Sequence, residues 1–226
     1  MRADVSLRKV YVNWLWVALV VGLAGTWPLV LKAQSSEEAD GDVRVGDRWV
    51  YDTKDEISGY PKDTYSEIVT EVSPNEIVTS WTYSGKPGSV LVTYDRSWSR
   101  TDNVIWKFKT NDGQGVRLPL AVGKTWRAEF DARNTQTGVN MRSSVSSKVV
   151  AQETITTPAG TFETFKIERT GREFKTTDPS KFSETHIVVW YAPKINHWIR
   201  RTYSTKYEKR IRSSTSEELS DFSRNF

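Results

Sequence analysis

Apolar and polar residues alternate in short runs along this chain from residue 43 onward, with the period of a β-strand. In the run 76–83, for example, Ile77, Trp81 and Tyr83 fall on one face, and mostly polar residues fall on the other. Runs of helical period and useful length are absent, whereas β-branched and aromatic residues recur between Gly, Pro, Asn, Asp and Ser. We therefore expect an all-β fold of about eleven strands. The expected strands are residues 48–52, 65–72, 76–83, 89–95, 104–109, 124–130, 144–156, 161–170, 185–191, 197–207 and 214–222.

The links between these runs are short and carry turn residues. Residues 73–75 read Ser-Pro-Asn, and residues 157–160 read Thr-Pro-Ala-Gly, with proline and glycine where a tight turn needs them. Residues 192–196 are expected to close the last hairpin. Short links favour neighbouring antiparallel strands in a meander, and one polar and one apolar face per run indicates a sheet wetted on one side. The predicted architecture is a strongly curved antiparallel sheet or an incomplete barrel.

Two segments of the sequence echo each other. Residues 45–49 read Val-Gly-Asp-Arg-Trp and residues 122–126 read Val-Gly-Lys-Thr-Trp. Each glycine can adopt a positive φ at a turn, and we assign Trp49 and Trp126 to the core. In both halves a longer connection, a Pro-containing turn and a further strand follow. The sequence permits two interpretations, a duplicated meander or a coincidental use of Gly-x-x-Trp at the start of a strand.

The N-terminal segment, residues 1–33, has the composition of an export signal. A basic start is followed by an apolar stretch over residues 14–31, and Ala33 suits a cleavage position. An uncleaved membrane anchor is the alternative, because 18 helical residues reach about 27 Å. Both interpretations place the remainder in the periplasm, released or anchored to the inner membrane. Residues 34–42 are an acidic linker, and residues 43–226 form a single β domain.

Charge and cysteine content exclude several classes of function. The segment 1–33 holds four Lys/Arg and one acidic residue, so the chain's 32 basic and 28 acidic residues leave 28 and 27 in the remainder. This near-neutral balance gives no reason to expect a nucleic-acid partner, and membrane contact is expected only through residues 14–31 if they are retained. The absence of cysteine excludes disulfides, thiol catalysis, Cys-based zinc sites and a lipid-modified cysteine.

Aromatic residues are the richest candidate chemistry. Seven tryptophans lie beyond residue 33, more than a β core of this size requires, so some are expected to line a surface or a cavity. Ordinary β packing is the alternative explanation. The candidates for a concave groove that binds an apolar, acyl or glycan ligand are Trp81, Tyr83, Tyr94, Trp98 and Trp106.

The densest basic stretch lies in residues 200–212. We expect a solvated face or cross-strand pairs with Glu217 and Glu218, and charge that protects an edge strand would explain the stretch equally well. Contact with phosphate head groups or an acidic glycan is a further possibility. The candidate anion contacts are Arg200, Arg201, Arg210 and Arg212.

Signals for catalysis are weak. His186 and His197 flank a predicted turn and could approach each other on paired strands, but two imidazoles without a third ligand make a poor metal site. No phosphate loop, dinucleotide fingerprint or Gly-x-Ser-x-Gly motif is present in the sequence. We therefore expect no metal, no cofactor and no catalytic residues.

Three motifs in the second half carry a family resemblance. They are Pro-Leu-Ala-Val-Gly-Lys-Thr-Trp at 119–126, Thr-Pro-Ala-Gly-Thr-Phe-Glu-Thr-Phe-Lys-Ile at 157–167 and Trp-Tyr-Ala-Pro-Lys-Ile at 190–195. Together they resemble a group of bacterial exported domains of unknown function, over roughly residues 115–202. The resemblance implies a periplasmic compartment and a fold similar to the curved half-barrels of Lol-type lipoprotein carriers. The chain departs from those carriers because it has no obvious helical lid.

The sequence thus predicts an exported bacterial envelope protein that binds or carries a ligand on a concave aromatic-lined β surface and does not catalyse a reaction. A structural scaffold that contacts an envelope protein partner without a small ligand is the alternative. A hydrolase is the third interpretation. A cavity lined by aromatic residues would favour the first, and a filled interior with an apolar outer patch would favour the second.

Overall fold

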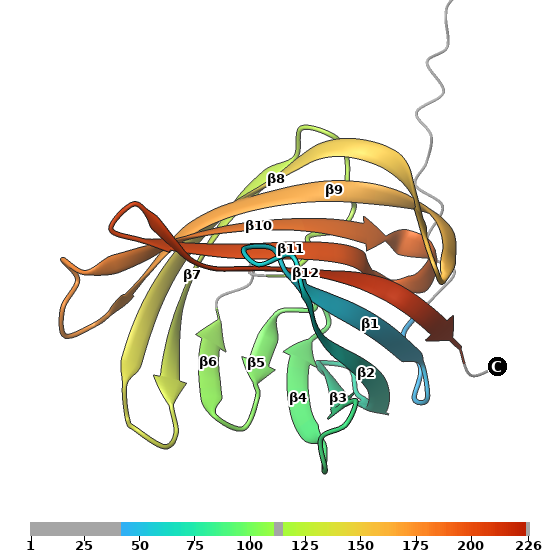
Figure 1. The fold of residues 1–226 in the computed structure, drawn as a ribbon, viewed down its shortest axis with the longest axis horizontal. Coiled ribbons are helices and arrows are strands. Elements are labelled where there is room, and N and C mark those ends of the chain that lie inside the picture. The colour runs from blue at the N-terminus through green and yellow to red at the C-terminus, as the bar shows by residue number, and fades with distance from the viewer. Residues whose placement is uncertain (1–41, 111–114, 225–226) are drawn as a thin grey trace, which may run out of the picture. The chain divides into compact units, whose positions relative to one another are not determined.

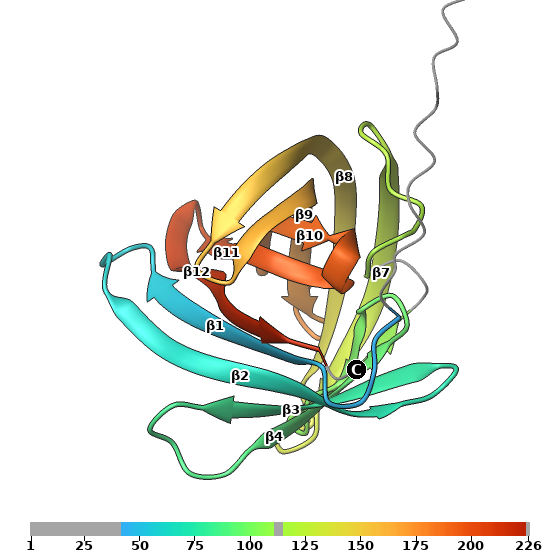
Figure 2. The ribbon, with the colours of Figure 1, turned by 90° about the vertical axis from the view of Figure 1, so that its right-hand side faces the viewer.

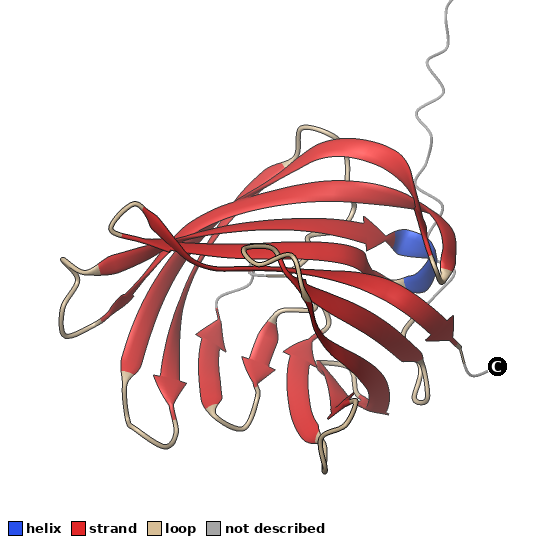
Figure 3. Ribbon diagram, in the orientation of Figure 1, coloured by secondary structure: helices blue, strands red, loops and turns tan. Residues whose placement is uncertain are grey.

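The computed structural model describes residues 42–110 and 115–224, and these residues form an almost purely β structure with one short helical turn (Figure 3). The predicted signal or anchor at 1–33 and most of the linker lie outside the described residues. The all-β prediction is confirmed. The strands are β1 Arg48–Asp55, β2 Pro61–Val72, β3 Glu76–Tyr83, β4 Val90–Asp95, β5 Arg100–Asp102, β6 Trp106–Thr110, β7 Thr125–Asn134, β8 Asn140–Thr157, β9 Gly160–Lys175, β10 Phe182–Ala192, β11 His197–Tyr207 and β12 Arg210–Ser223.

The strands form a closed antiparallel barrel in which each strand pairs with its neighbours in sequence and β1 pairs with β12. Figure 1 shows the long strands β8 to β12 arching over the shorter strands β3 to β6, and Figure 2 shows the same sheet from the side. The meander is confirmed, but the sheet closes where an incomplete barrel was expected. β12 pairs with β1 from Thr215 onward, whereas the part of β12 that carries Arg210 and Arg212 pairs with β11.

The turns follow the sequence signals with one exception. Residues 73–75 connect β2 to β3, Gly160 begins β9 with a φ of 133°, and a 3₁₀ turn at Pro193–Ile195 connects β10 to β11. The last hairpin, however, is the one between β11 and β12. Its two turn residues, Glu208 and Lys209, have φ of 49° and 63°, values that usually select Gly or Asn. The sequence therefore gave no signal for this turn.

The two echoing segments have matching backbone hydrogen bonds. The amide of Gly46 donates to the carbonyl of Val69 at 2.9 Å, and the amide of Gly123 donates to that of Val149 at 2.8 Å. In both halves the valine amide donates back to the residue after the glycine at 2.9 Å, and a register shift follows the valine in its pairing with the next strand. The glycine φ values are 93° and 91°. This correspondence supports the duplicated meander, with β1–β3 matching β7–β9.

The core confirms both tryptophan assignments. Trp49 is fully buried and Trp126 is 5% exposed, and both belong to one cluster of buried side chains. In the first half, aromatic rings fill the space between strands: Tyr51 stacks on Tyr65 at 5.2 Å, and Tyr65 stacks on Trp81 at 4.7 Å between ring centroids. Such offset ring pairs add to the stabilisation from burial. The first half of the barrel is therefore densely filled.

Candidate ligand-binding cavity

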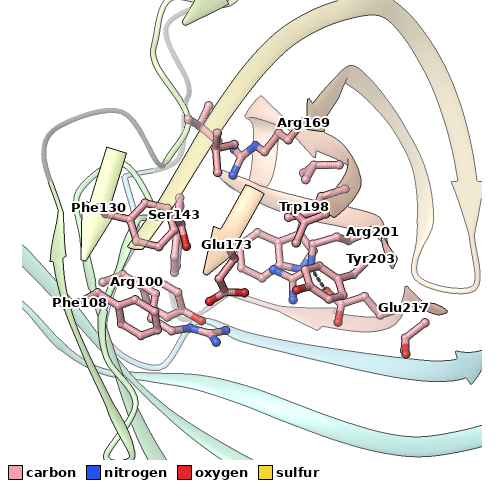
Figure 4. A pocket seen from close by; sticks show the side chains of 18 of the residues that line it. Arg100, Phe108, Phe130, Ser143, Arg169, Glu173, Trp198, Arg201, Tyr203 and Glu217 are labelled. Atoms are coloured by element: carbon pink, nitrogen blue, oxygen red, sulfur yellow. Dashed lines mark ion pairs between the residues drawn. The ribbon is translucent and has the colours of Figure 1, made fainter. Parts of the chain in front are cut away.

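A cavity of about 440 Å³ lies between the inward-facing side chains of the barrel. Nine strands, β4 to β12, contribute residues to its lining, so most of the barrel takes part in its wall. Figure 4 shows aromatic and charged side chains directed into one space. The volume falls within the range of about 300–1,000 Å³ that small-molecule sites occupy.

The cavity exists because the two repeats are filled differently. When the repeats are aligned on their matching hydrogen bonds, Ala128 takes the position of Tyr51, and Val145 takes the position of Tyr65. Val145 lines the cavity, whereas the two tyrosines are buried in the aromatic core. Gly171, which pairs with Val145, has no room for a side chain, because an added Cβ would lie 2.8 Å from the carbonyl oxygen of Ser144. Small residues thus leave open the volume that rings occupy in the first repeat.

The structure divides the five predicted aromatic residues. Tyr94 and Trp98 line the cavity and contact each other with ring centroids 5.3 Å apart. Trp81 is buried against Tyr65, Tyr83 is partly buried beside it, and Trp106 is partly buried at the start of β6. These last three are not among the lining residues. Four lining aromatics that were not predicted from the sequence are Phe108, Phe130, Trp198 and Tyr203.

Trp98 reaches the cavity from a strained turn. Its φ is 64°, an uncommon value for a bulky residue. Asp95 Oδ1 accepts hydrogen bonds from the amide and hydroxyl of Ser97 at 2.8 and 2.7 Å and from the amide of Ser99 at 2.9 Å. The indole Nε1 donates to Asn196 Oδ1 at 3.3 Å. The surrounding bonds therefore hold the ring over the cavity despite the backbone strain.

Replacing Asp95 by Ala should remove three hydrogen bonds to a carboxylate and lower the free energy of unfolding by about 2–3 kcal/mol. Asp95→Asn keeps an acceptor oxygen and should lose markedly less. Urea denaturation followed by circular dichroism measures both variants. Equal losses in the two variants would contradict the role given to the carboxylate oxygen.

The basic stretch forms the expected cross-strand pairs. Arg200 Nε lies 3.0 Å from Glu218 Oε1, and Arg201 Nε lies 2.7 Å from Glu217 Oε1, which confirms that prediction. Only one of these pairs lines the cavity, because consecutive residues face opposite sides of the sheet. Arg210 and Arg212 are exposed near the β11–β12 turn. The structure therefore does not gather the four predicted anion contacts into one site.

Arg201 is part of a network in the cavity wall. Its guanidinium lies 4.5 Å from the Trp198 ring centroid, and Tyr65 donates from its hydroxyl to the same Glu217 at 3.0 Å. Burial is the largest single effect and disfavours the charged guanidinium, but the attractions of Glu217, Tyr65 and Tyr94 together outweigh burial and raise the pKa of Arg201. The pair is held together in a low-dielectric environment, where such attractions are strong.

Three further arginines line the cavity: Arg100 on β5 and Arg169 and Arg172 on β9. Arg172 is exposed and lies 3.9 Å from Glu184. Burial, together with repulsion from Arg201, lowers the pKa of Arg169 to about 10. The one other acidic lining residue besides Glu217 is Glu173, whose pKa is raised by burial. None of these four residues was predicted from the sequence.

A buried polar group lies in the filled half of the barrel. Tyr51 donates from its hydroxyl to the Trp198 carbonyl at 2.7 Å and contacts His197 Nδ1 at 2.6 Å. A hydroxyl has one proton, and that of Tyr51 is donated to the carbonyl. In the contact with His197, Nδ1–H therefore donates to the hydroxyl oxygen, and Nε2 of the neutral ring can only accept. His197 Nε2 lies 3.8 Å from Glu67 Oε2, and both residues are fully buried. Burial raises the pKa of Glu67 to about 7 and lowers the pKa of His197 well below its usual range.

The two histidines do not approach each other, which corrects the expectation from their spacing. His186 pairs with Ser204 on β11 and is exposed to solvent. His197 pairs with Ala192 beside the turn and is buried. The β10–β11 hairpin is centred near residue 194, so His186 lies far from the turn on β10, whereas His197 lies close to the turn on β11. Within residues 42–110 and 115–224, no cluster of three or more potential metal ligands is present. In the same described part of the chain, no helix is long and apolar enough to cross a membrane.

These features define a closed antiparallel barrel with an aromatic and arginine-lined interior cavity. Residues 119–216 match the model of the DUF3108-like family, which covers somewhat less than half of the chain. This agrees in extent with the resemblance in the second half. The half-barrel form that the resemblance implied is not confirmed, because the ring of strands is closed.

Two solved structures share the fold. One, a protein from Bacteroides fragilis described as exported and as having a YmcC-like fold, is 16% identical, with a TM-score of 0.54, and the match covers 81% of this chain and 98% of that chain. The other, described as a lipoprotein from Parabacteroides distasonis, is also 16% identical, with a TM-score of 0.53 and coverage of 81% and 97%. No curated protein matches the sequence. At these identities the likeness establishes the fold alone.

Proposed function

We propose that this protein is a non-enzymatic ligand-binding or carrier protein of the bacterial envelope and that it holds a small apolar or amphipathic molecule inside the barrel. The observation that carries this proposal is the cavity of about 440 Å³ on a fold that otherwise buries its aromatic residues tightly. A scaffold has no need of open volume in its interior, since packed volume stabilises a fold. The small residues that leave the volume open therefore favour a binding role.

The positions of the histidines favour binding over hydrolysis. His197 is sealed in the core, and His186 is exposed on β10 outside the cavity lining. The common general base of hydrolases is thus not positioned at the cavity. The envelope location rests on the signal-like composition of residues 1–33. Because the sequence has no cysteine, a lipid-modified cysteine of the lipoprotein type is not available to this chain.

Filling the cavity should abolish binding. Val145→Trp places a ring where the first repeat has Tyr65, so the barrel is expected to accept it while the open volume is lost. The neutral fluorescent probe N-phenyl-1-naphthylamine should bind the wild-type chain saturably and bind Val145→Trp at least about tenfold more weakly. Val90→Trp, at a valine 40% exposed on β4, is the matched control and should leave binding unchanged. Absence of saturable binding to the wild type, or equal binding to both cavity forms, would overturn the proposal.

A further inference from the structure

Four hairpin tips at one end of the barrel carry exposed apolar side chains. Seven of the eleven large apolar side chains that are exposed in the described part of the chain lie on or beside these tips. They are Ile57 and Tyr60 between β1 and β2, Val90 and Leu91 at the start of β4, Val104 and Ile105 between β5 and β6, and Ile211 at the start of β12. Single apolar residues scattered over a surface are ordinary, but a concentration at one end indicates an interaction site.

The four tips are neighbours around the barrel. They join β11 to β12, β1 to β2, β3 to β4 and β5 to β6, and these eight strands are consecutive in the antiparallel ring. The amide of Glu56 donates to the carbonyl of Ser214 at 2.9 Å, so the β1–β2 tip lies against β12. Figure 2 shows the β1–β2 and β3–β4 tips together at the left. Residues 54–63, 84–91, 102–107 and 206–212 are referred to below as the rim.

The β5–β6 tip presents its apolar side chains from a strained backbone. Val104 has a φ of 71°, an outlying value for a β-branched residue, and its side chain is 59% exposed. The amide of Val104 donates to Asp102 Oδ1 at 2.7 Å, and Thr135 Oγ1 lies 3.0 Å from the carbonyl oxygens of both Val104 and Ile105. Packing inside the barrel does not explain strain at a residue with an exposed side chain. The strain therefore favours a role in contact with a partner.

The rim carries a surplus of positive charge. Its four segments contain eight Lys/Arg and five Asp/Glu, a difference of +3. The segment 206–212 holds four of the basic residues and one of the acidic residues, all of them exposed. Elsewhere on the rim, carboxylates are paired with lysines: Glu56 with Lys54 at 3.6 Å, Asp63 with Lys86 at 2.6 Å and Asp102 with Lys107 at 3.7 Å. The rim therefore combines apolar side chains with a basic hairpin.

We propose that the rim docks onto a lipid bilayer with anionic head groups. The apolar side chains lie on separate tips, so a protein partner would need a matching pocket for each tip. A bilayer instead accepts separate side chains at one level, and its head groups attract the basic hairpin. This is a membrane contact in addition to the one expected through residues 14–31.

The rim lies beside the cavity. Thr215 and Ser216 line the cavity and pair with Asp55 and Lys54, the last two residues of β1 before its tip. Phe108, another lining residue, lies on the short strand β6 that follows the β5–β6 tip. Docking would thus bring the cavity close to the membrane surface. If the proposed binding function holds, an apolar ligand would pass between bilayer and cavity with little exposure to water.

Site-specific fluorescent labels test the docking. The chain has no cysteine, so Ile57→Cys and Val104→Cys can each be labelled uniquely with an environment-sensitive nitrobenzoxadiazole dye in the full chain. Vesicles of phosphatidylcholine with about 30 mol% phosphatidylglycerol should raise the emission of both labels about twofold or more. Val122→Cys, at a valine 58% exposed before β7, is the matched control at the opposite end and should not respond. Each label reports its own surroundings, so binding through residues 14–31 would not mimic insertion of the rim.

Charge variants test the lipid class. Replacing Lys206, Arg210 and Arg212 together by Gln should raise the lipid concentration needed for half of the Ile57 label response at least about tenfold. The control replaces three exposed basic residues outside the rim, Arg127, Lys148 and Lys194, and should leave the response unchanged. Vesicles of phosphatidylcholine alone should give a weaker response, as should about 0.5 M NaCl.

The proposal is overturned if neither rim label responds to vesicles, or if the Val122 label responds equally. A rim label that changes with protein concentration in the absence of lipid would show that a second copy of the chain covers the rim, which also contradicts docking on a bilayer. Binding of N-phenyl-1-naphthylamine is measured separately. Its failure would overturn the proposed function while the response of the rim labels stands.

Discussion

Trp49→Ala is expected to lower the free energy of unfolding by about 3–5 kcal/mol. The side chain is fully buried, and its ring stacks on His197 at 4.2 Å with an interplanar angle of 17°. It also contacts Trp98 edge-on at 5.7 Å and Phe222 at 6.0 Å. Truncation would leave a large cavity among rings that are held by two different strands, β11 and β12, and by a turn, so the site cannot collapse easily. Urea denaturation monitored by circular dichroism measures the loss.

Two further variants test the interpretation of this result. Tyr60→Ala removes an aromatic ring that is 73% exposed and should change stability by less than about 0.5 kcal/mol. Trp126→Ala removes the corresponding ring of the second repeat and should also be strongly destabilising, because Trp126 belongs to the same buried cluster. A loss below about 1 kcal/mol in Trp49→Ala would show that this ring does not anchor the core.

The strands were predictable because their signal is local. The expected runs 76–83 and 197–207 coincide with β3 and β11, and each other expected run overlaps an observed strand. Alternating side chains and turn residues carry this information within a few positions. Strand β5, Arg100–Asp102, was missed because three polar residues contain no alternation. Closure of the barrel was missed because it depends on the pairing of β12 with β1. These strands are far apart in the sequence, and neither contains a local pattern that indicates which strand it pairs with.

The cavity was only partly predictable. An aromatic groove was expected, yet of its five proposed residues Tyr94 and Trp98 alone line the cavity. The sequence could not distinguish Trp81 from these two residues, because core aromatics and cavity-lining aromatics both occupy inward-facing positions of a strand. Arg100 and Arg169 lie outside the dense basic stretch that drew attention in the sequence, so local charge density did not reveal them. Comparison of the two repeats would have given a signal, since Arg169 takes the position of Trp81.

The buried pair of Glu67 and His197 predicts an unusual pH dependence. Burial raises the pKa of Glu67 from 4.5 to about 7, so its contribution to stability is fully present below about pH 4.5 and is lost as pH rises through 7. Burial lowers the pKa of His197 from 6.5, so its contribution is lost as pH falls below 6.5. Between about pH 4.5 and 6.5 the two contributions oppose each other, because the folded pair and the unfolded pair each carry one proton.

Glu67→Gln should separate the two contributions. The amide cannot ionise, so the variant should be more stable than the wild type by roughly 3 kcal/mol at pH 8, with the difference shrinking as the pH is lowered toward 5. Chemical denaturation at a series of pH values measures this difference. Glu71→Gln, at an exposed glutamate on the same strand β2, is the control and should show no such trend. A Glu67→Gln difference that is the same at pH 5 and pH 8 would mean that Glu67 is ionised in the folded barrel at both, with its charge compensated by a protonated His197 at 3.8 Å.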